Sequence, residues 1–326
     1  MGRAMALMPC RCLVTGAAGF IGSHLSERLV AEGCDVIGVD SFTDYYSRTL
    51  KEANLAALCS NPRFRLLETD LLAIDLPALV ASVAVVFHQA GQPGVRASWE
   101  RSFESYVRSN ILATQALLEA ARASRNLRRF VYASSSSVYG DAPKLPVRED
   151  TLPRPVSPYG VTKLAAEHLC VLYAKLGVPT ISLRYFTVYG PRQRPDMAFH
   201  KFIRALLTEQ EIHVTGDGDQ TRDFTFIDDI VDANLAVVEA AVDVVAGGVY
   251  NLGGGARVSI NEAVSLLERI VGRPARLRYR PVQPGEARHT YADTVAARSD
   301  FGFTPRHSLE VGLRAEADWL VKQLSA

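Results

Sequence analysis

The chain has 326 residues, long enough for a substantial hydrophobic core, and a formal net charge of only +1, which gives no support to nucleic-acid or membrane-surface binding through bulk electrostatics. No apolar run approaches the roughly 20 residues of a membrane span, and the apolar stretch 1–9 is too short for a signal peptide. We therefore expect a cytoplasmic protein with no nucleic-acid or membrane partner.

A buried strand, a glycine-rich turn and a helix are predicted in succession near the N-terminus. Residues 11–15 have the apolar character of a short strand, and a helical pattern continues to Glu32. Between them, Gly16 allows a tight turn, Gly19 lets the backbone approach a pyrophosphate, and Gly22 lets the helix pack on the strand. This arrangement predicts dinucleotide binding at the N-terminus of the helix.

The next predicted strand, residues 35–39, ends in Asp40. A carboxylate at this position can accept hydrogen bonds from the adenosine ribose, and it would repel a 2′-phosphate. No arginine follows directly, so the sequence favours NAD over NADP.

Strands and helices continue to alternate through the first two thirds of the chain. We predict strands at 64–71, 83–90, 130–133 and 179–185, with one of the intervening helices centred on 110–121. This alternation predicts an α/β fold of the Rossmann type, a doubly wound parallel sheet with its ligand at the carboxyl ends of the strands.

The pattern of strands and helices changes after about residue 190, which divides the chain into two parts. Residues 141–158 carry five prolines and are expected to form a loop, and a cluster of breaking residues follows Gly190. We expect an NAD-binding domain over 1–187, with a later return strand near 225–252, and a smaller substrate-binding lobe over 188–326.

Two short motifs in the first part point to chemistry. Ser157 and Pro158 suit the N-cap and first position of a helix, which would place Tyr159 and Lys163 on one face, one turn apart. A cation beside a phenol favours the phenolate and lowers the tyrosine pKa, which makes a general base for an alcohol proton. The serine run 134–137 ends a predicted strand and can hydrogen-bond the same alcohol.

The cysteines give no metal signal. They are odd in number and lack paired CxxC spacing, and the Cys10-x-Cys12 pair has no partner pair, so we expect no metal site. Free thiols in a reducing compartment are the expected state of Cys10, Cys12, Cys34, Cys59 and Cys170.

With these motifs, the chain resembles the extended short-chain dehydrogenases/reductases, specifically the NAD-dependent nucleotide-sugar epimerase and dehydratase group. The resemblance runs from Cys12 to about Gly312. It also rests on the following segments: His88-Gln89-Ala90-Gly91, Asn110, Arg184-Tyr185-Phe186, Gly216-Asp217-Gly218-x-Gln220-x-Arg222-Asp223-Phe224, Val249-Tyr250-Asn251-Leu252-Gly253 and Pro284-Gly285-Glu286.

The resemblance implies a set of site residues. Those expected at NAD, from the pyrophosphate to the nicotinamide, are Gly16, Gly19, Phe20, Ile21, Gly22, Asp40, Asp70, Leu71, Gln89, Ala90, Gly91, Gln92, Asn110, Tyr159, Lys163 and Tyr185. Tyr159, Lys163 and Ser135 are expected to be catalytic. Arg222 and Arg288 would hold the nucleotide diphosphate, and the full set expected at the substrate is Arg96, Ser135, Ser136, Thr187, Arg194, Arg222 and Arg288.

Departures from the group narrow the reaction. The dehydratases carry an Asp-Glu pair where this chain has Ser136 and Ser137, and the decarboxylases place a glutamate in this run. Many hexose epimerases carry asparagine at Thr187. The stretch 185–198 resembles UDP-glucuronate 4-epimerases, as does 92–96 apart from a proline where those enzymes usually have alanine.

A uronate substrate makes sense of these departures, because its 4-keto form is a β-keto acid that loses carbon dioxide readily. Ser136, Thr187 and Arg194 could hold its carboxylate, with Arg96 as a second candidate cation. Arg194 could instead cap loop carbonyls, and Thr187 could be an ordinary β-branched strand residue.

The resulting hypothesis is an NAD-dependent isomerase, a UDP-glucuronate 4-epimerase acting through a 4-keto intermediate with Tyr159 as base. The alternatives are a UDP-glucose/UDP-galactose 4-epimerase, a UDP-glucuronate decarboxylase and a non-catalytic NAD-binding protein. The resemblance also implies a homodimer, formed by packing the helix around residues 111–121 against the Tyr159 helix.

Overall fold

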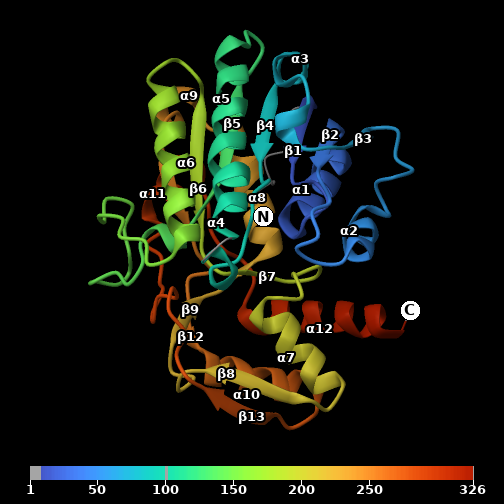
Figure 1. The fold of residues 1–326 in the computed structure, drawn as a ribbon, viewed down its shortest axis with the longest axis vertical. Coiled ribbons are helices and arrows are strands. Elements are labelled where there is room, and N and C mark those ends of the chain that lie inside the picture. Colours follow the sequence, from blue (N-terminus) through green and yellow to red (C-terminus); the bar gives the residue numbers. More distant parts are fainter. Residues whose placement is uncertain (1–8, 100–101, 326) are drawn as a thin grey trace.

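The fold is built around one parallel sheet, as the alternation of strands and helices predicts (Figure 1). The computed structural model describes residues 9–99 and 102–325. Seven strands are arranged in the order β11-β6-β5-β4-β1-β2-β3, and each neighbouring pair is parallel. They are β1 (Arg11–Thr15), β2 (Asp35–Asp40), β3 (Phe64–Glu68), β4 (Val85–His88), β5 (Arg129–Ser135), β6 (Thr180–Tyr185) and β11 (Val249–Leu252).

Helices cover both faces of this sheet. They are α1 (Phe20–Ala31) and α8 (Ile227–Glu239) on one face, and α3 (Leu76–Ala81), α5 (Ala113–Ala123) and α6 (Pro158–Ala174) on the other. The centre of strand β1 is apolar because both of its faces are covered. Val14 packs into the core beneath α1 and α8, whereas Leu13 packs into the core beneath α3, α5 and α6.

A smaller lobe gathers at the lower end of the molecule in Figure 1. Its parallel strand pair, β8 (Glu211–Thr215) with β13 (Arg276–Arg280), lies beside α7 (Ala198–Leu207) and α10 (Ile260–Val271). Strands β9 (Thr221–Asp223) and β12 (Arg257–Ser259) pair antiparallel, β7 (Val188–Tyr189) pairs with β10 (Thr225–Phe226), and α12 (Leu309–Ser325) packs against α7 and α10.

The chain crosses between the two parts more than once. After β9 and β10 it returns to the large sheet through α8, α9 (Val242–Val245) and β11, and α11 (Val295–Phe301) packs against β11. The remaining helices are α2 (Arg48–Leu55) and α4 (Phe103–Tyr106). Among residues 9–99 and 102–325, the structure contains no helix long and apolar enough to cross a bilayer.

The helix expected around residues 110–121 departs from a regular α-helix at its start. Residues Val107–Leu112 form a π-helical turn between α4 and α5. In this turn the buried Asn110 accepts a hydrogen bond from the Gln92 backbone N–H at 2.7 Å and donates one to Thr162 Oγ1 at 2.9 Å. The local widening thus turns Asn110 towards the loop after β4, a use typical of π-bulges at functional sites.

Candidate active site

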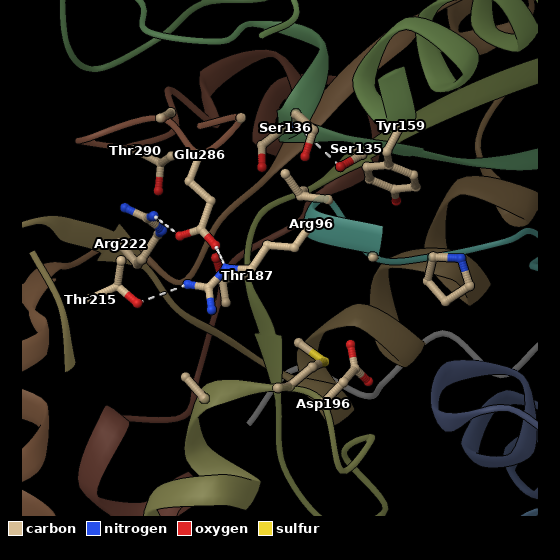
Figure 2. A pocket seen from close by; sticks show the side chains of 18 of the residues that line it. Arg96, Ser135, Ser136, Tyr159, Thr187, Asp196, Thr215, Arg222, Glu286 and Thr290 are labelled. Atoms are coloured by element: carbon tan, nitrogen blue, oxygen red, sulfur yellow. Dashed lines mark hydrogen bonds and ion pairs between the residues drawn. The ribbon is translucent and has the colours of Figure 1, made fainter. Parts of the chain in front are cut away.

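A cavity of about 1150 Å³ lies between the carboxyl end of the large sheet and the smaller lobe (Figure 2). Its wall includes Ser135 and Ser136 at the end of β5, Thr187 after β6, and Thr215 at the end of β8. Parallel strands place their carboxyl ends at one edge, which is where α/β folds bind their ligands.

Two of the three catalytic residues expected from sequence, Ser135 and Tyr159, line this cavity, whereas Lys163 does not reach its surface. Ser157 caps α6 by accepting a hydrogen bond from the Gly160 N–H at 3.1 Å, which starts the helix as predicted. A Cβ on Gly160 would lie 2.5 Å from the Ser137 carbonyl oxygen, so glycine lets α6 approach the serine run closely. As a result Tyr159 lies beside Ser135 (Figure 2).

Burial dominates the electrostatics of this wall. It raises the pKa of Tyr159, and a hydrogen bond with Ser135 and the positive charge of Arg194 only partly oppose it. Burial also lowers the pKa of Lys163 to about 8. The pKa of Tyr159 therefore moves opposite to the direction expected from Lys163 alone, because the phenolate loses more hydration than these neighbours restore.

Lys163 is nearly inaccessible, with 6% of its surface exposed. Its Nζ lies 4.7 Å from the centre of the Tyr132 ring, a cation–π contact that keeps the ammonium in place. A Cβ on Gly91 would lie 3.8 Å from the same Nζ, so Lys163 faces the loop after β4 as well as the serine run.

A buried polar network contacts the serine run 134–137 through Ser134. The sequence analysis did not predict this network. Glu167, on the next turn of α6 after Lys163, accepts hydrogen bonds from Ser134 Oγ at 2.6 Å and from Arg184 Nε and Nη2 at 2.9 and 2.6 Å. Arg184 also bonds Tyr139, which donates to Asn251 Oδ1 at 2.7 Å. The available signal was Arg184, the one charged residue in the strand β6.

The glycine-rich turn forms a cradle that suits a dinucleotide. Gly16 adopts a φ of +67°, and a Cβ there would lie 2.9 Å from Ala90, the residue after β4 and Gln89. A Cβ on Gly22 would lie 2.1 Å from the Gly16 carbonyl oxygen. The turn and the first turn of α1 can pack this closely only with glycine at both positions, which leaves the N-terminus of α1 accessible to phosphate.

The two acidic residues expected near the adenosine are both engaged within the chain. Asp40 accepts hydrogen bonds from the Ala18 and Phe42 backbone N–H groups at 3.1 and 2.8 Å, and Lys51 Nζ lies 3.5 Å away. Asp70 caps the turn that contains Leu71 and forms an ion pair with Arg108. These contacts fix both carboxylates at the carboxyl ends of β2 and β3.

Gln89 and Tyr185, expected beside the nicotinamide, are brought together. Gln89 Nε2 donates to the Tyr185 hydroxyl at 3.1 Å, and Asn234 of α8 bonds both side chains. Tyr185 lines the cavity, as do Phe20 and Ile21 from the start of α1.

Two of the expected arginines line the cavity away from the serine run: Arg222 lies opposite Tyr159, and Arg96 reaches across the cavity towards Glu286 and Thr215 (Figure 2). Glu286 lies between them, 2.7 Å from Arg96 Nε and 3.4 Å from Arg222 Nη2. Arg96 also donates to Thr215 Oγ1 at 3.1 Å. This arrangement concentrates positive charge beside the lobe, with one carboxylate as an internal counter-ion.

Arg288, by contrast, lies outside this cavity. Its side chain is about half exposed and forms an ion pair with Asp217 at 2.7 Å. The family resemblance implied that Arg288 holds the diphosphate together with Arg222, but here its guanidinium pairs with Asp217. Only its backbone carbonyl approaches Arg222, accepting a hydrogen bond from Nη1 at 3.1 Å.

Arg194 lines the cavity near Tyr159. Asp196 holds its Nε and Nη2 at 2.9 and 3.1 Å, which leaves Nη1 without a hydrogen-bond partner among the described residues. Asp196 also accepts a hydrogen bond from Tyr45 at 3.2 Å, and a Cβ on Gly94 would lie 2.2 Å from that hydroxyl. The loop after β2, to which we assigned no role from the sequence, thus reaches the loop between β7 and α7.

Comparisons with known proteins agree with this geometry. Residues 12–253 match the model of the NAD dependent epimerase/dehydratase family. An uncharacterized UDP-glucose epimerase of Bacillus subtilis is 45% identical over 95% of this chain and 98% of its own. A UDP-glucuronate 4-epimerase of Thermodesulfobacterium geofontis is 39% identical over 94% and 95%. The crystal structure of the UDP-glucuronic acid 4-epimerase of Bacillus cereus, in complex with UDP-glucuronic acid and NAD, superposes with a TM-score of 0.93, at 46% identity over 96% and 99% of the two chains.

Proposed function

Because the chain belongs to the NAD-dependent epimerase/dehydratase family, we propose that it interconverts UDP-glucuronate and UDP-galacturonate by epimerisation at C4. The observation that carries the substrate assignment is the single cavity in which Arg194, Thr187 and Ser136 are placed near Tyr159. The similarity to the Bacillus cereus enzyme bound to UDP-glucuronic acid and NAD supports the same reaction.

The chain's own residues fit NAD as cofactor. The cradle of Gly16, Gly19 and Gly22 would hold the pyrophosphate, with Asp40 at the ribose and Asn110 and Tyr185 towards the nicotinamide. Bound NAD⁺ would take up hydride from C4 and return it to the opposite face, and its positive ring would favour the phenolate form of Tyr159.

Tyr159 acts as the general base on O4 in this proposal. Its phenolate takes the O4 proton, holds it at the phenol oxygen during the ketone stage, and returns it when the alcohol reforms. Ser135 hydrogen-bonds O4 and fixes the distance to the phenol oxygen, and the buried ammonium of Lys163 adds positive charge beside the reacting groups. The cavity of about 1150 Å³ leaves room for the hexose to turn over while the diphosphate stays anchored.

A uronate imposes an additional requirement on this site. The 4-keto uronate loses carbon dioxide when its carboxylate bond aligns with the ketone π system, so the enzyme must hold the carboxylate out of that alignment. Arg194 offers Nη1, and Thr187 and Ser136 offer hydroxyl groups, from three separate elements. Three fixed partners can define the plane of a carboxylate, which one partner cannot.

The charged side of the cavity suits the UDP moiety. Arg222 and Arg96 carry the guanidinium groups that face the cavity there, and a diphosphate would replace Glu286 as their counter-ion. Arg288 would serve only after its ion pair with Asp217 opened, so we assign the diphosphate mainly to Arg222.

The deciding experiment is proton NMR of purified protein incubated with UDP-glucuronate or UDP-glucose, without added NAD. We expect UDP-galacturonate to form much faster than UDP-galactose. Arg194→Gln should slow uronate turnover and release carbon dioxide with a UDP-pentose, whereas Arg192→Gln, which removes an ion pair to Glu27 on α1 instead, should do neither.

Other outcomes favour the alternatives. Faster turnover of UDP-glucose would make the chain a UDP-glucose 4-epimerase, as the name of its Bacillus subtilis relative suggests. Stoichiometric carbon dioxide release by the unmodified protein would indicate a decarboxylase. An NAD-bound protein that converts neither sugar would indicate a non-catalytic role.

We also propose that the protein forms a homodimer in the cytoplasm, through α5 and α6. Leu112, Val161, Leu172 and Leu176 on and next to these adjacent helices are 47–53% exposed, which is costly for aliphatic side chains in water. A second copy of the same helices would cover them. Light scattering after size exclusion should give twice the mass of one chain, and the Leu172→Glu variant should give the mass of a single chain.

A further inference from the structure

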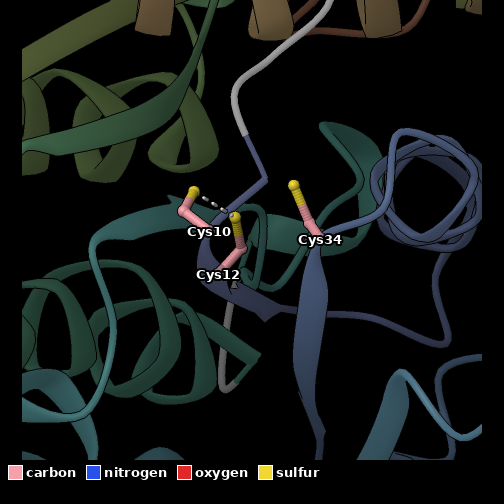
Figure 3. Close-up of side chains that lie close together, drawn as sticks. All are labelled: Cys10, Cys12 and Cys34. Carbon is pink, nitrogen blue, oxygen red and sulfur yellow. Dashed lines mark hydrogen bonds between the residues drawn. The ribbon is translucent and has the colours of Figure 1, made fainter.

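Three cysteine sulfurs converge at the amino ends of β1 and β2, far along the strands from the cavity (Figure 3). Cys10 and Cys12 project from the same side of the first strand, and Cys34 precedes the second. All three sulfurs lie within 4.8 Å of one another, and those of Cys10 and Cys12 are 3.6 Å apart. The sequence showed only the Cys10-x-Cys12 pair, and the pairing of β1 with β2 adds the third thiol.

We propose that Cys10, Cys12 and Cys34 bind one thiophilic divalent cation, zinc or cadmium, as three thiolates. Sulfurs that share a zinc ion at about 2.3 Å lie roughly 3.8–4 Å from one another. The observed separations differ from this by less than about an ångström, a shift that side-chain rotation can supply. Thiolate ligands select such soft ions over magnesium or calcium.

The surroundings of the cluster suit a bound ion. Cys12 and Cys34 are fully buried, whereas Cys10 is partly exposed, so an ion can enter past Cys10 and keep a solvent molecule as fourth ligand. Three thiolates and a divalent cation leave one net negative charge. Arg128 acts electrostatically on Cys10 and Arg63 on Cys34, which offsets that charge.

The backbone holds the ligands in register. The Asp35 N–H donates to the Cys10 carbonyl oxygen at 3.1 Å, and the Cys34 N–H donates to Leu29 at the end of α1. An ion at the cluster would therefore tie the first strand to the second at their amino ends. The NAD cradle begins at Gly16, beyond the opposite end of β1, so this site is independent of the epimerase chemistry.

Cadmium titration of the reduced, metal-free full-length protein tests the proposal, because cadmium thiolates absorb in the ultraviolet by charge transfer. We expect the band to saturate at one ion per chain, and zinc to displace it. Cys10→Ser should weaken cadmium binding by more than about tenfold, since even partners outside the coordination sphere are worth that much. Cys59→Ser, which alters an exposed thiol elsewhere, should bind as the unmodified chain does.

NAD content and the circular dichroism spectrum serve as checks on folding, and both should be unchanged in Cys10→Ser because that side chain is partly exposed. If Cys10→Ser proves unfolded, Cys34→Ala supplies the same comparison from the second strand. No charge-transfer band in the unmodified chain, or an equal band in the correctly folded ligand variant, would overturn the proposal. So would loss of the band in Cys59→Ser.

Discussion

The two sides of the cavity differ in how far their side chains are exposed to solvent. On the reacting side, Ser135 and Lys163 are buried, with 9% and 6% of their surfaces exposed, and Tyr159 is partly buried. On the anchoring side, where Glu286 lies between Arg96 and Arg222, the Arg96 and Glu286 side chains are 47% and 34% exposed, and the Arg222 side chain is 15% exposed. Figure 2 shows Ser135 and Tyr159 on one side and Arg222 with Glu286 on the other, with the Arg96 side chain reaching between them.

The contrast follows from what each side must do. A proton transfer requires donor and acceptor to be fixed in advance, and burial also strengthens their electrostatic interaction. An anchor needs only to exchange one counter-ion for another, which solvent-exposed ion pairs do at little cost. We therefore expect changes on the reacting side to reduce kcat, and changes on the anchoring side to raise KM.

The largest effect should come from Tyr159→Phe, which removes the base but keeps the ring. We expect kcat to fall by about 10²–10⁴-fold, the usual contribution of a positioned general base. NAD content after extraction should match that of the unmodified protein. Turnover within tenfold of normal would show that Tyr159 is not the general base. It would also contradict the assignment of kcat to the reacting side and KM to the anchoring side.

Arg222→Gln tests the anchoring side. Loss of one charge-assisted contact to the diphosphate should raise KM for every UDP-sugar by roughly 10–100-fold, with kcat little changed. Arg278→Gln is the matched control, because its exposed side chain pairs with Glu211 and does not line the cavity, so KM should stay near normal. A large fall in kcat for Arg222→Gln would show that the anchoring side also positions the reacting groups.

Low pH should lower the stability of the protein through His88, which is buried in the large sheet and hydrogen-bonds Thr15 and Thr114. Burial lowers the pKa of His88 from 6.5 to about 3, so the unfolded chain binds the extra proton first and stability is lost as pH falls below about 6.5. At about pH 5 this amounts to about 2 kcal/mol. Urea unfolding at about pH 7 and about pH 5 should show a smaller fall in the free energy of unfolding for His88→Gln than for the unmodified protein. An equal fall in both proteins would exclude His88 as the cause.

Tyr45→Phe tests the contact between the loop after β2 and the loop between β7 and α7. Without the hydrogen bond to Asp196, Arg194 is less well fixed, and KM for UDP-glucuronate should rise by about three- to tenfold, equivalent to about 1 kcal/mol. Inhibition by UDP, which lacks the sugar, should not change. Tyr46→Phe is the control, because that buried hydroxyl has no hydrogen-bond partner among the described residues.

Salt should produce the smallest effect and separate the two sides without mutation. Raising the ionic strength from about 0.05 M to about 0.5 M shortens the Debye length roughly threefold and screens exposed charges. We expect KM for the UDP-sugar to rise by roughly two- to fivefold while kcat stays within about twofold. A fall in kcat with unchanged KM would show that salt acts on the reacting side and not on the anchoring side, which would contradict this comparison.

The sequence predicted the parts of the site whose geometry is local. The turn at Gly16 and the one-turn spacing of Tyr159 and Lys163 follow from the conformations of a few adjacent residues. Alternating strands and helices likewise indicate the doubly wound sheet, because strand and helix periodicities are properties of short segments. The π-helical turn at Asn110 could not be predicted this way, since the Asn110 side chain in it bonds Gln92 and Thr162, which lie far from it along the chain.

Only the tertiary structure decided which charged and thiol groups meet. Arg288 pairs with Asp217 instead of facing the cavity, and Glu286 joins Arg96, which lies 190 positions earlier in the chain. The Cys10, Cys12 and Cys34 cluster likewise depends on the pairing of two strands. Side-chain chemistry is written in the sequence, but these partners are far apart along the chain, and their distances are set by how the strands and lobes pack.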